Sequence, residues 1–487
     1  MSYEQLYNGI IRKPYAHQRE AVEFAKGKNN VLLFWEMGTG KTGGAILLAR
    51  SKYTDHGRLL RTLIVTPPVT ITNWKNEFRL WSQIDPSQVH CMVQATGAKK
   101  AEYMYNKVIP QTSGAVVITN YEALLTEQFY LAIERWAPEL IIFDEVHYVK
   151  TAKAKRSKLC QRLVTKSLNN FSLTGTPILK DVRDVFGIFR TADNGETFGK
   201  NEQLFAFRYL VDENAGWAGK AGYFPKWKNN PATFGELNQK IYTKSLRKLK
   251  SECLDLPPLV KIQRFVGMSP DQMKAYKNME RDYMLYLEAS DSTVTANIAV
   301  VKALRLLQIC TGFVGTDLGE DHVFEKNPRL EICEEYLEEL TPNHKVIVWC
   351  SFRQNYRMME KVCKKLGVDY VMLTGEQDSR EKGEAVDRFQ NDPKCRVIIA
   401  NRASGGVGVN LTAASYSIVY SRNFSLAEEL QSEARNHRGG SEIHDQIVKI
   451  DLCTQDTIEV GVLESLMNKQ EGAEAVLDRI RGSNVRG

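Results

Sequence analysis

The sequence predicts an α/β protein with two parallel-sheet lobes in tandem and helical insertions between them. Short apolar runs alternate with helical stretches, and this alternation occurs twice along the chain. A length of 487 residues is too great for one hydrophobic core and suits two or three domains. The hydrophobic fraction of 43% and the charged fraction of 25% are ordinary for a globular protein.

The strand candidates are apolar runs that each end in a polar or glycine-bearing loop. In the first lobe they are Val31 to Trp35, Leu63 to Val65, Ala115 to Ile118, Leu140 to Phe143 and Phe171 to Leu173. In the second lobe they are Lys345 to Cys350, Tyr370 to Leu373, Arg396 to Ala400, Tyr416 to Tyr420 and Gln446 to Leu452. We therefore expect a first lobe over 1–195, an insertion over 196–255, an interlobe linker with a helical insertion over 256–330, and a second lobe over 331–487.

The strand alternation fades between the two lobes. This region holds an aromatic patch of Trp217, Tyr223, Phe224 and Trp227. We expect the patch to form the small core of the insertion rather than a platform on which bases stack. The segment Leu256-Pro257-Pro258-Leu259 is expected to cross from one lobe to the other.

A phosphate-binding loop is predicted at Glu36-Met37-Gly38-Thr39-Gly40-Lys41-Thr42, because this run follows a strand and precedes a helical stretch from Gly43 to Arg50. Glycines let backbone N–H groups point at phosphates, Lys41 would reach the β- and γ-phosphates, and the Thr42 hydroxyl would bind Mg²⁺. Trp35 stands where the full pattern has a glycine. The alternative interpretation is an ordinary glycine-rich turn.

A pair of carboxylates supports the nucleotide interpretation. The buried strand Leu140 to Phe143 delivers Asp144-Glu145-Val146-His147 at its carboxyl end, the edge where parallel sheets bind ligands. Asp144 would hold Mg²⁺, and Glu145 would orient and deprotonate the attacking water. The alternative, a solvated acidic pair, fits poorly with the apolar run before it.

Basic residues suggest two further contacts. In Gln431-Ser432-Glu433-Ala434-Arg435-Asn436-His437-Arg438, the two arginines are three residues apart and are expected to share one helix face. They could act as arginine fingers on the γ-phosphate, or form a solvated face. A basic run could touch a nucleic-acid backbone or be a solvated helix face. This run consists of Lys150, Lys153, Lys155, Arg156 and Lys158.

The composition indicates where the protein is located and which kinds of partner it binds. The nine cysteines form no Cys-x-x-Cys pair, so neither a zinc module nor a disulfide framework is indicated. No apolar run is long enough for a membrane span, and Met1 to Gln5 show no signal-peptide pattern. The expected location is a reducing cytoplasm, and no membrane partner is expected. The net charge of +7 favours a polyanionic partner.

Together these motifs resemble helicase superfamily 2, and within it the SWI/SNF-related (sucrose non-fermenting type) double-stranded-DNA translocases. Besides the two nucleotide motifs, several segments of the first lobe are similar to family motifs: Tyr15-Ala16-His17-Gln18, Thr66-Pro67-Pro68 with Asn73-Trp74 and Glu77, Thr119-Asn120-Tyr121-Glu122, and Leu173-Thr174-Gly175-Thr176-Pro177. Three segments of the second lobe are also similar: Trp349-Cys350-Ser351-Phe352, Leu373-Thr374-Gly375, and the run from Ser404 to Thr412.

Three features point to the SWI/SNF branch in particular. They are Ser269-Pro270-Asp271-Gln272 with Tyr276, the helix-like Leu304 to Cys310, and the Gln-x-x-x-Arg-x-His-Arg form of Gln431 to Arg438. Two departures are Trp35 in place of an acidic residue, and Gly439-Gly440-Ser441 in place of Ile-Gly-Gln. The chain resembles a bare motor without appended modules, which suits a bacterial cell or a virus-infected host.

The resemblance implies two RecA-like lobes that use ATP and Mg²⁺, with Arg435 and Arg438 closing onto the nucleotide. Gln18 would read the adenine, and Gly408 would join the phosphate-binding residues Gly38, Thr39 and Gly40. Loops at the opposite edge of both sheets would hold DNA phosphates. The implied nucleic-acid contacts are Thr66, Pro67, Asn73, Thr119, Asn120, Ser351, Phe352, Thr374, Gly375, Gly405 and Asn410. The implied coupling residues are His147, Thr174, Thr176 and Gln431.

The function implied is an ATP-driven motor that moves along double-stranded DNA and remodels DNA or protein–DNA complexes. Two alternatives remain: a strand-separating or fork-remodelling helicase acting on DNA or RNA, and an ATP-gated nucleic-acid clamp that hydrolyses slowly. The expected partners are duplex DNA and a recruiting protein. The motor itself is expected to be monomeric.

Overall fold

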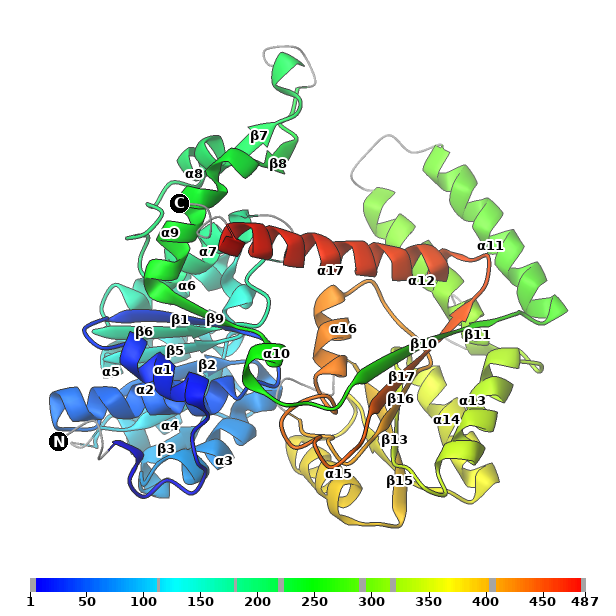
Figure 1. Cartoon of the computed structure of the whole chain (residues 1–487), viewed down its shortest axis with the longest axis horizontal. Coiled ribbons are helices and arrows are strands. Elements are labelled where there is room, and N and C mark those ends of the chain that lie inside the picture. The colour runs from blue at the N-terminus through cyan, green and yellow to red at the C-terminus, as the bar shows by residue number, and fades with distance from the viewer. Residues whose placement is uncertain are drawn as a thin grey trace. The chain divides into compact units, whose positions relative to one another are not determined.

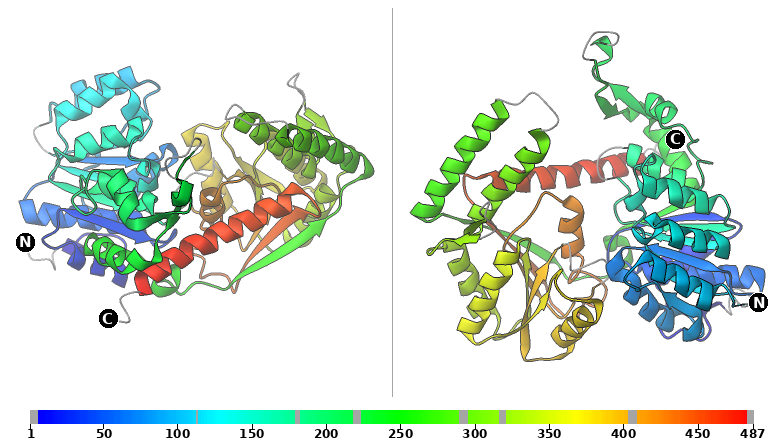
Figure 2. Two further views of the ribbon diagram at one scale, coloured as in Figure 1. Left: turned by 90° about the horizontal axis from the view of Figure 1, so that it is seen from above. Right: turned by 180° about the vertical axis from the view of Figure 1, so that it is seen from behind.

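The computed structural model describes residues 6–111, 114–178, 182–217, 223–288, 295–315, 321–402 and 409–482. The chain forms two compact units. The first unit comprises Met1–Leu254 and Lys469–Gly487, and the second comprises Asp255–Asn468. Each unit is built around one parallel sheet with helices on both faces (Figures 1 and 2). This confirms the predicted fold class.

The sheet of the first unit has seven strands in the order β3-β4-β2-β5-β6-β1-β9, and all neighbours are parallel. The strands are β1 (Asn30–Trp35), β2 (Thr62–Thr66), β3 (Val89–Cys91), β4 (Val116–Asn120), β5 (Leu140–Asp144), β6 (Asn169–Leu173) and β9 (Ser245–Lys248). Because the neighbours are parallel, the carboxyl ends of these strands meet at one edge of the sheet.

Alternate residues of these strands pack on opposite faces. Leu32 and Phe34 enter one hydrophobic cluster, and Leu33 and Trp35 enter another. One face is covered by α1 (Ala16–Phe24), α2 (Lys41–His56) and α3 (Ile71–Trp81). The other face is covered by α4 (Gly97–Tyr103), α5 (Glu127–Trp136), α6 (Lys155–Val164), α7 (Arg183–Ala192), α8 (Glu202–Tyr209) and α9 (Phe234–Lys244).

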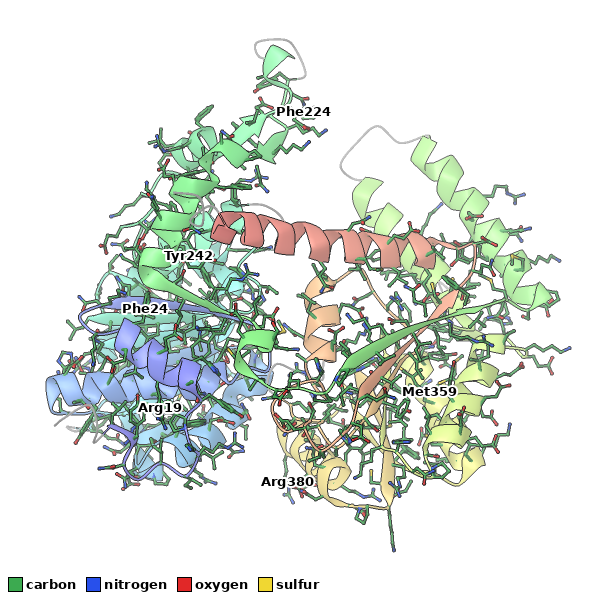
Figure 3. The ribbon with its side chains drawn as sticks, in the orientation of Figure 1. Arg19, Phe24, Phe224, Tyr242, Met359 and Arg380 are labelled. Atoms are coloured by element: carbon green, nitrogen blue, oxygen red, sulfur yellow. The ribbon has the colours of Figure 1, made fainter. Side chains whose placement is uncertain are left out.

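The insertion after α8 contains an antiparallel hairpin of β7 (Leu210–Asp212) and β8 (Trp227–Asn229). The expectation of an aromatic core here is wrong for two described members of the patch. Phe224 is 72% exposed (Figure 3) and Tyr223 is 38% exposed, whereas Trp227 packs partly against the core. The hydroxyl of Tyr223 donates to Asp212, which keeps this ring at the surface.

The sheet of the second unit has six strands in the order β10-β17-β16-β13-β15-β14, again all parallel. The strands are β10 (Leu259–Val266), β13 (Val346–Cys350), β14 (Asp369–Leu373), β15 (Cys395–Asn401), β16 (Tyr416–Val419) and β17 (Ile447–Thr454). A two-stranded hairpin of β11 (Phe313–Gly315) and β12 (Asp321–Val323) lies outside this sheet.

Helices again cover both faces of the second sheet. One core joins it to α13 (Pro328–Leu340) and α14 (Arg353–Leu366), and the other joins it to α15 (Ser379–Asn391). The remaining helices are α10 (Lys250–Cys253), α11 (Pro270–Glu288), α12 (Thr295–Cys310), α16 (Leu426–Glu433) and α17 (Ile458–Gly482).

All ten predicted strands are present, within a few residues of the expected limits. Of the strands in the two large sheets, β3, β9 and β10 were not predicted. β10 begins at the last residue of the predicted crossing segment and is mostly exposed, because it pairs with β17 at the edge of the sheet. An exposed edge strand carries no continuous apolar run, so its sequence does not mark it.

Candidate functional site

The nucleotide motifs of the first unit lie at the carboxyl edge of three neighbouring strands. The loop from Glu36 to Gly40 follows β1, Asp144 ends β5, and Thr174 directly follows β6. The sheet order β5-β6-β1 places these strand ends side by side. Ligands of parallel α/β sheets bind at such an edge.

The loop after β1 has the backbone of a phosphate-binding loop. Gly38 and Gly40 have φ angles of 87° and 81°, which side chains with a Cβ rarely adopt. Gly40 is the N-cap of α2, so the unsatisfied N–H groups and the positive end of this helix face the loop. Thr42 lies in the first turn of α2, where its hydroxyl can reach a cation held beside the phosphates.

Two residues of α1 brace this loop. The Nε2 atom of His17 lies 2.8 Å from the carbonyl oxygen of Thr39, and Nε2 of Gln18 donates to the carbonyl of Gly40 at 2.9 Å. The Oε1 atom of Gln18 accepts from the backbone N–H of Tyr15 at 2.9 Å. Gln18 is fully buried, so its amide holds the loop in this structure. Its role in reading adenine stays a prediction.

The Lys41 ammonium points back over the loop. Its Nζ atom donates to the carbonyls of Trp35 at 3.0 Å and Glu36 at 3.2 Å. Trp35 is fully buried, and its ring lies where a Cβ on Gly44 would come within 2.8 Å. The large side chain of Trp35 therefore fits at this position because Gly44, in the next helix, has no side chain.

Asp144 is buried at the end of β5, and three donors reach it. Its Oδ2 atom accepts from Oγ1 of Thr66 at 2.9 Å and from Nε1 of Trp74 at 2.8 Å. The hydroxyl of Tyr121 donates to its backbone carbonyl at 2.7 Å. Burial, and then the adjacent Glu145 carboxylate, raise the pKa of Asp144 to about 6, against the opposing effect of the two side-chain hydrogen bonds.

Glu145 follows in a left-handed conformation with φ of 51°, so the backbone leaves the direction of the strand at this residue. Its Oε2 atom lies 3.2 Å from Nδ1 of His147. The same Nδ1 lies 3.1 Å from Oγ1 of Thr174, and this hydroxyl also accepts from the backbone N–H of Thr176 at 3.1 Å. Three predicted coupling residues therefore form one chain of contacts beside the proposed base.

These groups fit Mg²⁺ bound together with a nucleotide. Among the described residues, no group of three or more His, Cys, Asp or Glu side chains forms a metal site. Mg²⁺ is usually held by one or two carboxylates together with substrate phosphates and water, so a dedicated protein cage is not needed. A buried carboxylate with a raised pKa gains most from a nearby cation. Asp144 and Thr42 can supply the protein ligands.

The predicted location of the nucleic-acid contacts at an opposite edge of the sheet is wrong. Thr66 ends β2 and Asn120 ends β4, so both lie at the same carboxyl edge as the nucleotide motifs, displaced along it toward β3. The reason is that all the strands run parallel. Thr66 and Thr119 are fully buried, whereas Asn73 and Asn120 are half-buried. Pro67 lies in the same loop as Thr66.

In the second unit, the predicted contacts also follow carboxyl ends of strands. Ser351 and Phe352 follow β13, and Thr374 and Gly375 follow β14. Ser351 is tied to the next strand end, because its N–H donates to Oγ of Ser421 at 2.7 Å. Asn410 is exposed, while Gly405 and Gly408 lie outside the described residues.

The prediction that Arg435 and Arg438 share a helix face is wrong. The helix α16 ends at Glu433, and both arginines lie in the turns that follow. The carbonyl of Arg435, which a continuing helix would use internally, instead accepts the N–H of Leu411. Arg438 reaches back to the carbonyl of Val409, with a donor–acceptor distance of 3.5 Å. Gln431, in the last turn of α16, is half-buried.

Ion pairs account for part of the basic run. Lys150, Lys153 and Arg156 pair with acidic side chains of the first unit. The partners are Asp184, Glu202 and Glu122. Because Lys150 and Lys153 precede α6, these contacts favour a charged surface segment of which only the last part is helical.

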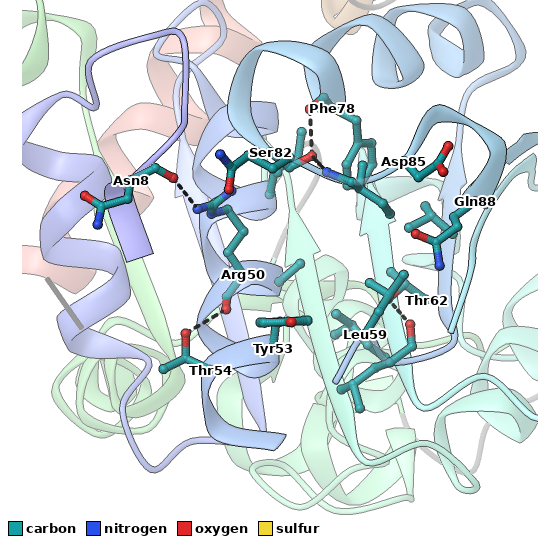
Figure 4. A pocket seen from close by; sticks show the side chains of 17 residues that line it. Asn8, Arg50, Tyr53, Thr54, Leu59, Thr62, Phe78, Ser82, Asp85 and Gln88 are labelled. Carbon is teal, nitrogen blue, oxygen red and sulfur yellow. Dashed lines mark hydrogen bonds between the residues drawn. The ribbon is translucent and has the colours of Figure 1, made fainter. Parts of the chain in front are cut away.

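A cavity of about 500 Å³ lies away from these motifs. It is lined by α2, α3 and the starts of β2, β4 and β5, so it lies toward the amino edge of the sheet (Figure 4). Arg50 crosses it and donates to the carbonyl of Asn8 at 3.0 Å. The nucleotide motifs therefore do not form this cavity.

The site contains residues that the sequence analysis did not assign. Trp74 and Tyr121 hold the side chain and backbone of Asp144, and His17 holds the phosphate loop. These three residues lie inside or beside motifs to which the sequence assigned a different role. Their contacts join positions 22 to 70 residues apart, which spacing alone does not reveal.

The fold and this edge are those of nucleotide-binding α/β proteins with a phosphate loop. A family model described as SNF2-related domain matches residues 17–312, and one described as helicase conserved C-terminal domain matches residues 328–440. The first match covers more than half of the chain. The protein therefore belongs to the SNF2-related family.

The chain is similar to many longer proteins. It is 24% identical over 470 residues to the human SWI/SNF-related matrix-associated actin-dependent regulator of chromatin subfamily A member 1, covering 91% of this chain and 41% of that protein. It is 24% identical over 472 residues to an uncharacterised ATP-dependent helicase of Mycoplasma genitalium, covering 96% and 42%. It is 23% identical over 500 residues to a Saccharomyces cerevisiae ISWI chromatin-remodeling complex ATPase, covering 98% and 41%.

The chain thus spans less than half the length of these curated relatives. Among solved structures, it is similar to the Sulfolobus solfataricus SWI2/SNF2 ATPase core in complex with dsDNA, with 20% identity and a TM-score of 0.43. That similarity covers 99% of this chain and 97% of the other. In the described part of the chain, no helix has the length and apolar character needed to cross a membrane.

Proposed function

We propose that the protein is a DNA-dependent ATPase that uses ATP hydrolysis to move along double-stranded DNA and to remodel DNA or protein–DNA complexes. One observation carries this proposal: in a SNF2-related chain, the loop bearing Lys41 follows β1 and the pair Asp144 and Glu145 follows β5, and these two strands flank β6 at one edge of the sheet. Several relatives are named as chromatin-remodelling ATPases or ATP-dependent helicases, which supports the same activity.

The residues divide the chemistry of ATP hydrolysis among them. Lys41 and the N-terminus of α2 would bind the phosphates, and Thr42 and Asp144 would hold Mg²⁺, which neutralises charge on the phosphate oxygens. Glu145 would orient the water and take its proton as the oxygen attacks the γ-phosphorus. Arg435 and Arg438 would neutralise charge that develops on the transferred group.

A single ATPase assay tests the proposal and separates it from its alternatives. Turnover is measured with duplex DNA, single-stranded DNA and RNA of equal length, and Lys41→Ala serves as the inactive control. Strong stimulation by duplex DNA is expected. Preference for single strands or RNA would favour a strand-separating helicase, and negligible turnover with tight ATP-dependent binding would favour a clamp.

One observation favours strand separation as a second candidate function. Separation needs a wedge between strands, and the hairpin of β7 and β8 lies beside two exposed rings, Phe207 at 73% and Phe224 at 72%. Aromatic rings can stack on unpaired bases. A forked duplex and a triplex are offered to the same preparation. Triplex displacement with poor fork unwinding supports the translocase, whereas fork unwinding that Phe224→Ala abolishes supports the wedge.

A further inference from the structure

We propose that Trp74 is a positioning residue that links the segment after β2 to the Mg²⁺ ligand Asp144, so that duplex DNA and Mg²⁺–nucleotide strengthen each other's binding. This inference rests on the proposed function. It concerns one buried hydrogen bond between α3 and the end of β5, with Nε1 of Trp74 donating to Oδ2 of Asp144 at 2.8 Å. Trp74 is fully buried in the first half of α3.

The indole is the constant donor to this carboxylate. Thr66 and Thr70 together have two hydroxyl protons, but their oxygens take part in three contacts: Thr66 with Asp144, Thr66 with Thr70, and Thr70 with the carbonyl of Pro67. One of the three contacts therefore lacks a proton at any moment. The N–H of Trp74 has a single acceptor, so its bond to Asp144 does not depend on how the hydroxyls share their protons.

The same bond leaves part of the carboxylate open for a cation. Both side-chain donors use Oδ2, and in the part of the chain that the structure describes, no hydrogen bond reaches Oδ1. A hydrogen bond to one carboxylate oxygen orients the other, as outer-shell partners of metal ligands do. Trp74 thus sets the direction in which Asp144 presents its remaining oxygen.

The position of Trp74 provides the link to nucleic acid. Asn73 precedes it in α3 and is half-buried, and it is the predicted backbone contact of this segment. A phosphate held at Asn73 would fix the start of α3, and with it the indole and the carboxylate. Coupling of this kind is reciprocal, so Mg²⁺–nucleotide must raise the affinity for duplex by the same factor.

The test uses Mn²⁺ as a probe of the Mg²⁺ site, with its binding to the full chain and ADP followed by electron paramagnetic resonance. Trp74→Phe keeps an aromatic ring but loses the donor. We expect it to weaken Mn²⁺ binding by about tenfold or more, the effect of one hydrogen bond to a charged group. We also expect it to remove the increase in Mn²⁺ affinity that duplex DNA causes in the wild type.

Trp136→Phe is the matched control. Trp136 is the last residue of α5, and its buried ring packs on the opposite face of the sheet from α3. This variant should bind Mn²⁺ as the wild type does, with and without duplex. Equal Mn²⁺ affinities in the two variants would overturn the proposal.

A wild-type measurement covers the case in which Trp74→Phe does not fold. In protein labelled with ¹⁵N-tryptophan, the indole N–H resonance of Trp74 should shift when Mg²⁺ and ADP are added, and again when duplex is added. The resonance of Trp136, on the other face of the sheet, should stay in place. An unmoved Trp74 resonance would overturn the inference. Failure of the proposed function would instead appear as ATPase turnover that duplex does not stimulate, with the Mn²⁺ effect without DNA intact.

Discussion

His147 and Thr174 join the carboxyl ends of β5 and β6, because Nδ1 of the imidazole lies 3.1 Å from Oγ1 of the threonine. The same Nδ1 lies 3.2 Å from a carboxylate oxygen of Glu145. The imidazole therefore lies between the proposed base and the residue that follows β6. We expect a movement of the loop after β6 to reach Glu145 through this ring.

Removing the Thr174 hydroxyl should impair hydrolysis while sparing ATP binding. In Thr174→Val the ring of His147 loses a partner, and the N–H of Thr176 loses its acceptor. We expect duplex-stimulated turnover to fall about fivefold, which corresponds to one hydrogen bond of ordinary strength. Thr174→Ser keeps the hydroxyl and should retain most of the rate. Steady-state ATPase assays with saturating duplex compare the two, and equal rates would remove Thr174 from the coupling role.

Lys41→Ala and Glu145→Gln should separate binding from hydrolysis. Lys41 would contact phosphate in the ground state and in the transition state, so its loss should weaken ATP binding. Glu145 would act on water, so its amide should still bind ATP while turnover falls on the order of a hundred- to ten-thousandfold. Binding of a fluorescent ATP analogue and steady-state turnover measure the two effects. Wild-type turnover in Glu145→Gln would show that another residue is the base.

The sequence predicted those parts of the site in which the functional residues are close together in one motif. The loop bearing Lys41 and the acidic pair after β5 are local patterns, and the parallel sheet brings them to one edge. Contacts across the sheet were not predicted, as with Trp74 and Asp144, which are 70 residues apart. The prediction that Arg435 and Arg438 lie on a helix was also wrong, because the end of a helix depends on its tertiary contacts. The helix before Arg435 ends at Glu433, and the carbonyl of Arg435 accepts the N–H of Leu411 from another loop.

Glu139 should give the first unit an acid-sensitive contribution to stability. Its carboxylate accepts from both terminal nitrogens of Arg58 and from the N–H of Arg61, and the hydrogen bond from Arg58 is the main cause that lowers its pKa from 4.5 to about 2. A carboxylate whose pKa is lower in the folded state stabilises the fold at pH values above its unfolded pKa. This contribution is lost as the pH falls through the folded-state pKa. The contribution should therefore disappear between pH 4.5 and 2.

Glu139→Gln should lower the free energy of unfolding at pH 7 by about 1 kcal/mol, as expected for a partly exposed ion pair with good geometry. The difference from wild type should shrink as pH falls below 4.5. Chemical denaturation across this pH range measures it. Glu23→Gln, which removes an exposed ion pair with Lys26 in the same unit, is the control and should change stability little. A pH-independent difference for Glu139→Gln would contradict the assignment.

Duplex binding should ignore sequence and depend steeply on salt. The proposed contacts are to phosphates, and each neutralised phosphate contributes about −0.9 to the slope of log K against log salt on B-DNA. Fluorescence anisotropy with several unrelated duplexes, each titrated at several salt concentrations, measures both properties. A preferred sequence bound about a thousandfold tighter than scrambled duplex at equal salt would indicate readout of bases rather than of the backbone.

Arg438→Ala should abolish duplex-stimulated turnover and leave ATP affinity far less changed than Lys41→Ala does. Arg438 belongs to the second unit and Lys41 to the first, so the arginine is expected to act only when a closed state forms around the transferring phosphate. Its effect should then appear in the transition state, where such arginines contribute roughly a thousandfold or more.

The control for Arg438→Ala is Arg380→Ala, which removes an arginine of the same unit whose side chain is 86% exposed and pairs with Glu384. This variant should keep wild-type turnover. Nucleotide binding and duplex-stimulated turnover are measured for Arg438→Ala, Arg380→Ala and Lys41→Ala in parallel. If ATP binding collapsed equally in the Arg438 and Lys41 variants, Arg438 would be a ground-state ligand. The interaction made by Arg438 would then contribute to ATP binding in the ground state. This result would exclude an arginine finger that acts only in the transition state.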